Sequence, residues 1–138
     1  MEDKPLVSVC LPTHNGAFFL KEALDSLKNQ THQNMELIAS DDASTDETFN
    51  ILTKFAENFS FHCKVVRHEP DGIAENWNNT LKLANGKYIK FLFQDDVMYP
   101  DCIEKMVFVL EKDKGIGLVC SKRDIITDKD NRFTQGFI

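Results

Sequence analysis

Two pairs of adjacent aspartates are the residues in this sequence most suited to chemistry: Asp41-Asp42 and Asp95-Asp96. Neighbouring carboxylates repel each other, which costs stability unless a positive charge lies between or beside them. A hard divalent cation, held by one or two carboxylates and by substrate phosphates, would supply that charge. The alternative is that one acid of each pair caps the following helix while the other is solvated. For Asp41-Asp42 this alternative is strengthened by a helix expected to start at Ser44.

Several other patterns with known chemistry are absent from the sequence. It contains no Gly-x-Gly-x-x-Gly, no phosphate-cradling loop that ends in Lys-Ser or Lys-Thr, and no Gly-x-Ser-x-Gly. Trp77 is expected in the core rather than as a platform for a ligand. The histidines lack metal-ligand spacing, and we expect them at the surface or in turns: His14, His32, His62 and His68.

Short apolar runs alternate with amphipathic stretches along the chain. This alternation is typical of an α/β domain with a mostly parallel sheet and helices on both faces. The expected strands are Val7–Leu11, Met35–Ser40, Cys63–Arg67, Tyr88–Phe93 and Ile116–Cys120. The polar tail from Lys122 could form a hairpin around a turn at 128–131.

Four helices are expected between and after these strands. Apolar residues at helical spacing place the first at about Ala17–Asn29. The second starts at Ser44 with a Ser-x-x-Glu capping box to Glu47. The third has a buried stripe of Ala74, Trp77, Leu81 and Ala84 and ends at Gly86, and the fourth has Pro100 in its first turn and carries Ile103, Met106, Val107 and Leu110.

Ligands of such sheets bind beyond the carboxyl ends of the strands. Polar residues follow four of the predicted strands, at 12–16, 41–46, 68–72 and 94–96. We therefore expect Asp41 and Asp95 at one edge of the sheet, at the ends of neighbouring strands. This convergence is the strongest indication of a site in the sequence.

Composition narrows the class of protein. The chain has 138 residues, 42% of them apolar, with a formal charge of −6. That excludes a disordered chain, and it argues against broad nucleic-acid binding, which needs a basic surface. We expect one domain, no membrane span, and four free thiols in a reducing compartment, with Cys10 and Cys120 buried in strands.

The motifs in order resemble those of a family 2 glycosyltransferase with the GT-A fold, a Rossmann-like α/β fold. The similarity extends over roughly residues 6–112, and separate motifs in the right order make it specific. The motifs that carry it are Val7–Asn15, Ser26–Thr31, Asp41–Thr48, Asn76–Asn78 with Ala84–Ile89, and Phe91–Asp96 with Pro100.

The resemblance implies a site for a nucleotide-diphospho-sugar donor. Thr13 and Asn15 would line the nucleotide pocket and Asp41 would contact the base, typically uracil. Asp95 would lie near the ribose and the metal, Mg²⁺ or Mn²⁺, with Asp96 as the alternative metal ligand. The complete set of nucleotide-binding residues that we expect is Pro12, Thr13, Asn15, Asp41, Asp42 and Asp95.

Two positions depart from the family pattern. Phe93 stands where many members have the first acid of Asp-x-Asp, and Trp77 stands where many have Arg. A phosphate contact at position 77 is therefore not carried over.

The resemblance further implies metal-dependent, inverting transfer of a sugar, typically from a UDP-sugar, to the hydroxyl of a saccharide or lipid-linked acceptor in surface polysaccharide synthesis. We expect a cytoplasmic location, peripheral at the inner face of the membrane. The chain ends where the acceptor-binding half should begin, so a truncated chain is expected, with the catalytic base beyond Ile138. A non-catalytic nucleotide-sugar-binding module is the alternative. A phosphatase-like domain is disfavoured, because its acids would follow the first strand.

Overall fold

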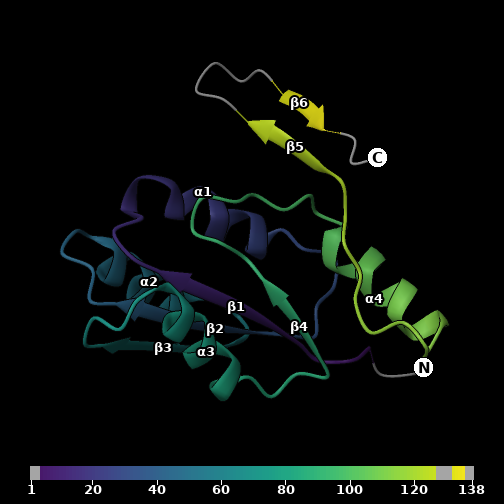
Figure 1. Ribbon diagram of the computed structural model, residues 1–138, viewed down its shortest axis with the longest axis horizontal. Helices are drawn as coiled ribbons and strands as arrows, with labels where there is room; N and C mark the ends of the chain where they lie inside the picture. Colours follow the sequence, from purple (N-terminus) through teal and green to yellow (C-terminus); the bar gives the residue numbers. More distant parts are fainter. Residues whose placement is uncertain (1–3, 127–131, 136–138) are drawn as a thin grey trace. The chain divides into compact units, whose positions relative to one another are not determined.

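A computed structural model describes residues 4–126 and the backbone of 132–135 (Figure 1). The chain divides into two compact units, one up to Glu104 and one from Lys105. The expectation of a single donor-binding domain over 1–138 stays a prediction. The elements of the first unit are β1 (Val7–Thr13), α1 (Ala17–Lys28), β2 (Met35–Asp42), α2 (Thr48–Asn58), β3 (His62–His68), α3 (Ile73–Leu83), β4 (Tyr88–Phe91) and the start of α4 (Cys102–Lys112).

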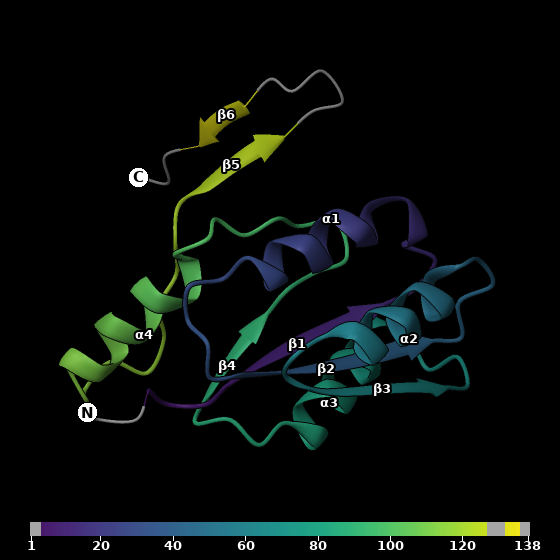
Figure 2. The same ribbon diagram turned by 180° about the vertical axis from the view of Figure 1, so that it is seen from behind.

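The first unit is built on a four-stranded sheet in the order β3-β2-β1-β4, with every pair parallel. Helices α1 and α2 lie on one face and α3 on the other (Figures 1 and 2). Every residue of β1 and β2 is buried, because these central strands are covered on both sides. The expected parallel α/β architecture is confirmed.

The carboxyl ends of the strands meet at one edge of this sheet, as expected. Asp41 pairs in register with Thr13 of β1 and with Arg67 of β3. Asp95 follows β4, which pairs with the other side of β1. The two acids therefore share an edge, but their strands flank β1 and do not pair with each other.

The second helix begins later than expected. Its first residue is Thr48, and Glu47 occupies the cap position without a side-chain capping bond. The predicted capping box from Ser44 is wrong, because the Ser44 hydroxyl donates to the carboxylate of Asp41 instead.

Helix α3 turns a different face to the sheet from the one predicted. Its buried residues are Asn76 and Thr80, whereas Trp77 and Leu81 are 39% and 41% exposed. The predicted apolar stripe, and with it a core position for Trp77, is wrong. Polar residues take the inner face because Asn76 is bonded there, through its amide nitrogen, to the backbone oxygen of Thr13.

The second unit contains most of α4 and a small hairpin. Residues 116–120, expected to form a strand, are irregular, and Cys120 is exposed rather than buried, whereas Cys10 is buried as expected. The expected hairpin is confirmed by antiparallel β5 (Arg123–Ile126) and β6 (Arg132–Gln135). Its turn at 128–131 lies outside the described residues. Across the described ranges, no helix is long and apolar enough to cross a membrane.

The four histidines differ in their location and burial. His62 and His68 lie at the two ends of β3, and His14 is in the loop after β1. His32 lies in the loop before β2 but is 1% exposed, because its Nε2 bonds the backbone oxygen of Pro5 at 3.0 Å. A surface position for His32 is therefore wrong.

Candidate functional site

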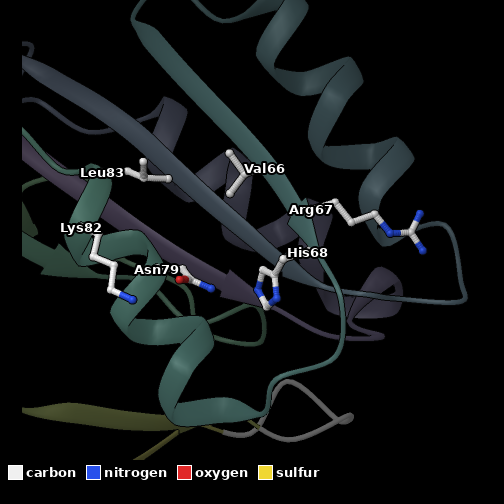
Figure 3. Close-up of a pocket in the computed structure, with 6 residues that line it drawn as sticks. All are labelled: Val66, Arg67, His68, Asn79, Lys82 and Leu83. Atoms are coloured by element: carbon white, nitrogen blue, oxygen red, sulfur yellow. The ribbon is translucent and has the colours of Figure 1, made fainter.

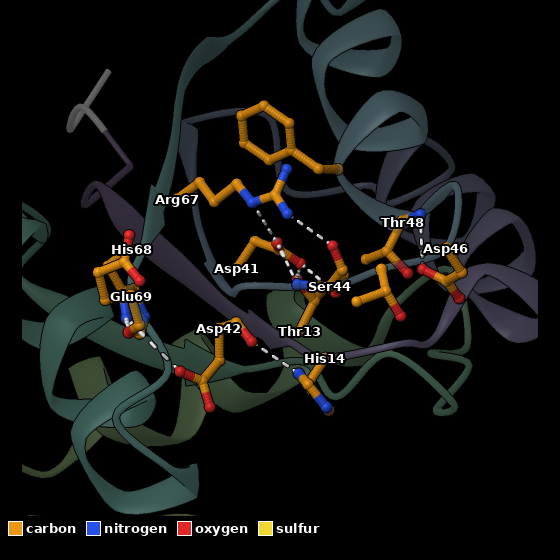
Figure 4. Close-up of polar contacts among 12 residues, drawn as sticks. Thr13, His14, Asp41, Asp42, Ser44, Asp46, Thr48, Arg67, His68 and Glu69 are labelled. Carbon is orange, nitrogen blue, oxygen red and sulfur yellow. Dashed lines mark hydrogen bonds and ion pairs between the residues drawn. The ribbon is translucent and has the colours of Figure 1, made fainter.

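Asp41 lies beneath the edge of the sheet as the centre of a hydrogen-bonded cluster (Figure 4). Its Oδ1 accepts from the hydroxyls of Thr13 at 3.0 Å and Ser44 at 2.5 Å, and its Oδ2 accepts from the Ser44 backbone N–H at 3.0 Å. The guanidinium Nε of Arg67 is 3.7 Å from Oδ2. The carboxylate is fully buried, and these contacts fix the loop that follows β2.

Asp42, the next residue, is held by a different loop. Its carboxylate accepts from the backbone N–H groups of Asp71 at 2.7 Å and Gly72 at 3.1 Å. Gly72 has a φ of +85°, in the left-handed region that glycine adopts most readily. Asp42 therefore fixes the turn that leads into α3.

His68 lies beside Asp42, with its Nδ1 3.5 Å from the Asp42 Oδ1 (Figure 4). Nδ1 is 2.7 Å from the backbone oxygen of Glu69, and Nε2 is 3.0 Å from Oδ1 of Asn76. Burial lowers the pKa of His68, but the bonds to Asn76 and Glu69 and the nearby Asp42 outweigh it, so the pKa is raised. Two acceptors suit the imidazolium, which donates from both nitrogens.

The loop after β1 is held by Gln94, in the loop after β4. The side-chain amide of Gln94 accepts from the His14 N–H at 2.9 Å and donates to the His14 carbonyl at 3.0 Å. A Cβ at Gly16 would lie 2.2 Å from the Gln94 side chain, so only glycine leaves room for this clamp. Asn15 has a φ of +47°, and its Oδ1 accepts from the Thr45 N–H at 2.8 Å.

A cavity of about 380 Å³ opens at this edge of the sheet. Polar and apolar side chains both line it. Of the six expected nucleotide-binding residues, four line it and two do not. The lining residues are Pro12, Thr13, His14, Asp42, Gly72, Ile73, Asn76, Trp77, Phe93, Gln94 and Asp95.

The remaining expected residues lie close to this cavity without lining it. Asp41 is buried beneath Thr13, and Asn15 bonds the loop after β2. Asp96 is exposed, and its N–H bonds the carbonyl of Phe93 at 3.0 Å. The roles expected for these residues stay predictions.

The carboxylates here suit a metal that is shared with a ligand. In the part of the chain that the structure describes, no three His, Cys, Asp or Glu side chains are grouped to hold an ion. Asp95 lines the cavity, and Asp96 follows it directly. Mg²⁺ commonly uses one or two carboxylates together with substrate phosphates. The residues therefore fit a metal completed by a diphosphate, but not a cage made by the protein alone.

A second cavity, of about 240 Å³, lies between β3 and α3 (Figure 3). Val66 and His68 point toward α3, whereas the guanidinium of Arg67 points away from it. The Arg67 guanidinium instead packs over the Phe49 ring at 5.4 Å and bonds the Ser44 carbonyl at 2.7 Å. This cavity therefore lacks the charge of Arg67.

Gln30 is a positioning residue to which the sequence alone gave no role. It is buried, and its amide donates to the carbonyls of Ser26 and Tyr99 while its Oε1 accepts from the Ile103 N–H at 3.1 Å. It thereby joins the end of α1 to the start of α4. A glutamine after the last turn of a predicted helix is too common a feature to have revealed this.

The sequence and the fold were compared with those of known proteins. An uncharacterized glycosyltransferase of Rickettsia prowazekii is 38% identical over 78% of this chain, which spans 33% of that relative's length. The crystal structure of Staphylococcus aureus TarS 1-349 with UDP-GlcNAc matches 77% of this chain and 31% of TarS, at 29% identity and a TM-score of 0.71.

A second solved structure is similar over a slightly shorter part of the chain. It is the mannosyltransferase PcManGT of Pyrobaculum calidifontis with GDP-Man and Mn²⁺, at 29% identity and a TM-score of 0.65 over 70% of this chain and 29% of PcManGT. The likeness to these enzymes confirms the expected GT-A type of sheet. The sequence model for Glycosyl transferase family 2 matches residues 8–137, and the chain belongs to that family.

Proposed function

We propose that this chain binds a nucleotide-diphospho-sugar and provides the donor site of an enzyme that transfers the sugar to an acceptor hydroxyl. The observation that carries the proposal is the cavity at the carboxyl edge, where Thr13, Asp42 and Asp95 meet. Family membership and the UDP-GlcNAc bound by the similar TarS structure support it. A UDP-sugar is the donor that we favour.

Within this site the chain's own residues bind and orient the donor. Pro12 and Thr13 line the cavity, and the bonds from Gln94 to the His14 backbone hold the neighbouring loop in place. Asp95 lines the cavity from the loop after β4, where the ribose and diphosphate would lie. Contact of Asn15 with the nucleotide and of Asp41 with the base belongs to the same proposal.

Asp95 and Asp96 are the proposed ligands of a divalent metal, Mg²⁺ or Mn²⁺. When bound, such an ion neutralises the negative charge that develops on the departing diphosphate. A chain with a formal charge of −6 has few other means of attracting a diphosphate. The Mn²⁺ reported with the similar PcManGT supports this assignment.

The proposal has three further parts. The transfer inverts the configuration at the sugar, the acceptor is a saccharide or is lipid-linked, and the protein acts in the cytoplasm at the inner face of the membrane. Inversion requires a base on the face opposite the leaving group, within hydrogen-bond reach of the acceptor hydroxyl.

Isothermal titration calorimetry with UDP, UDP-GlcNAc and GDP-mannose, each with and without Mn²⁺, tests donor binding. We expect UDP-GlcNAc to bind, more tightly with Mn²⁺, and Asp95→Ala or Asp96→Ala to remove the metal-dependent part. Glu22→Ala removes an exposed acid of α1 and serves as the charge-matched control. Equal metal dependence in all the variants would overturn the metal assignment, and the absence of heat with every nucleotide would overturn donor binding.

A binding module without catalysis is the second candidate. Of the two carboxylates that line the cavity, Asp42 already accepts two backbone N–H groups and Asp95 is the proposed metal ligand, so neither is well placed to take a proton from an acceptor. A radiolabelled UDP-GlcNAc assay over several acceptors separates the two candidates. Sugar transfer or hydrolysis above the rate without protein supports the enzyme, and binding without either supports the module.

A further inference from the structure

The two positions that depart from the family pattern are in contact. The Trp77 ring on α3 and the Phe93 ring after β4 have centroids 4.8 Å apart, at an interplanar angle of 34°. The Phe91 ring is 5.5 Å from that of Trp77 and 6.0 Å from that of Phe93. The three side chains form an aromatic cluster at the end of β4.

These rings form one wall of the cavity at the carboxyl edge. Trp77 and Phe93 both line it, together with Ile73. Trp77 is 39% exposed because the face of α3 that packs on the sheet is the one with Asn76 and Thr80. The indole packs against Phe91 of β4, and its exposed part is available to a ligand.

The same cavity is also lined by polar residues, among them Thr13, Asp42 and Asp95. A cavity with one aromatic wall and a few polar groups suits a ligand that combines a flat ring with hydroxyls and phosphates. Aromatic side chains stack on planar bases and pack against the C–H face of a sugar ring. A nucleotide-sugar contains both kinds of ring.

We infer that Trp77 and Phe93 form a stacking surface for a ring of the nucleotide-sugar, either its base or its sugar. The inference rests on the proposed donor binding and adds where part of the affinity arises.

Trp77 is the only tryptophan in the chain, so its fluorescence reports on this wall alone. We expect UDP-GlcNAc to change the emission saturably, with the dissociation constant found by calorimetry. A change with UDP and uridine as well assigns the stacked ring to the base. A change with UDP-GlcNAc and N-acetylglucosamine 1-phosphate, but with neither UDP nor uridine, assigns it to the sugar.

Variants supply the second measurement. Stacking on an aromatic side chain is worth about 1–3 kcal/mol, so Trp77→Ala or Phe93→Ala should weaken UDP-GlcNAc binding by about 5- to 150-fold. Trp77→Leu keeps an apolar side chain without a flat ring, and it should lose affinity while keeping the wild-type circular dichroism. Leu81→Ala is the matched control, since Leu81 is equally exposed on α3 but does not line the cavity.

The outcomes separate this inference from the proposed function. Calorimetric binding of UDP-GlcNAc with unchanged Trp77 emission, or with equal affinity in the Trp77→Leu and Leu81→Ala chains, overturns the stacking surface and leaves donor binding intact. The absence of heat with every nucleotide overturns the proposed function and the stacking surface together.

Discussion

Replacement of Asp41 separates two roles that this residue could have. The resemblance to the family implies a contact with the base, whereas the structure shows a fully buried carboxylate occupied by Thr13 and Ser44. If Asp41 acts through these contacts, Asp41→Ala should destabilise the fold, and any loss of affinity for UDP should follow from the loosened loop.

The expected loss of stability follows from the atoms left behind. Removing the carboxylate orphans the buried Ser44 N–H, at about 1–3 kcal/mol, and leaves the Thr13 and Ser44 hydroxyls to find new partners. Arg67 adds little, because its side chain is 46% exposed and its Nε lies 3.7 Å from the carboxylate. We therefore expect Asp41→Ala to lower the free energy of unfolding by about 2–4 kcal/mol, from the orphaned N–H together with the two lost hydroxyl bonds.

Asp41→Asn is the more informative substitution. Its amide oxygen can accept from the Ser44 N–H, and its NH₂ can face the Thr13 and Ser44 hydroxyls, which rotate to accept. What remains lost is the charge of the acceptor. We expect a smaller loss of stability, about 1–2 kcal/mol, since hydrogen bonds to a charged group are worth about 1.5–3 kcal/mol and neutral ones about 1 kcal/mol.

The assay is urea unfolding followed by Trp77 fluorescence, with UDP affinity measured on the same chains by calorimetry. Asp25→Ala is the control, because Asp25 forms an exposed pair with Lys21 that solvent screens and that should contribute little to stability. The reasoning is refuted if Asp41→Asn unfolds at the wild-type urea midpoint yet abolishes UDP binding. That result would mean that the carboxylate contacts the nucleotide directly.

Three further predictions concern the contacts around the site and the fold. The pKa of His68 is raised in the folded state, so the protonated ring stabilises the fold fully below about pH 6.5, the pKa of the unfolded chain, and this stabilisation is lost as the pH rises through the folded-state pKa. Urea unfolding at several pH values should show this fall in the free energy of unfolding for the wild type and not for His68→Gln. Burial raises the pKa of Glu36, but bonds from Ser8 and Asn85 outweigh it and lower the pKa overall. Its stabilisation should therefore be lost as the pH falls from about 4.3 through the folded value, a loss absent in Glu36→Gln. Gly16→Ala should displace the Gln94 amide and lower the free energy of unfolding by about 1–3 kcal/mol for two hydrogen bonds, and a second substitution, Gln94→Ala, should then add little in the same unfolding assay.

The central strands were the easiest part of the fold to predict. β1 and β2 are buried on both faces, and each contains a continuous apolar run, 9–11 in β1 and 37–39 in β2. The run at 116–120 looks similar, yet it is irregular in the structure. A strand needs a neighbour as well as an apolar composition, and composition does not reveal the neighbour.

Two predictions about helices, the start of α2 and the buried face of α3, were wrong because polar side chains bond to partners elsewhere in the fold. Ser44 and Glu47 match a capping box, but the Ser44 hydroxyl lies 2.5 Å from Asp41, an acceptor that precedes the motif. On α3, apolar periodicity selected the face of Trp77, whereas Asn76 faces the sheet because Thr13 and His68 supply it with partners. In both cases a tertiary hydrogen bond overrode the local pattern.

The convergence of polar residues at one edge of the sheet was predictable, but the side chains that face the cavity were not. Successive residues of a strand point to opposite faces, so only one of Asp41 and Asp42 can point toward α3. Asp42 does so, beside Gly72, while Asp41 points toward α2 with its register partner Arg67. The period of two requires the division, but which acid takes which side depends on where α2 and α3 pack. An acid pair that looks equivalent in sequence is thus divided by the fold into one carboxylate at the cavity and one beneath it.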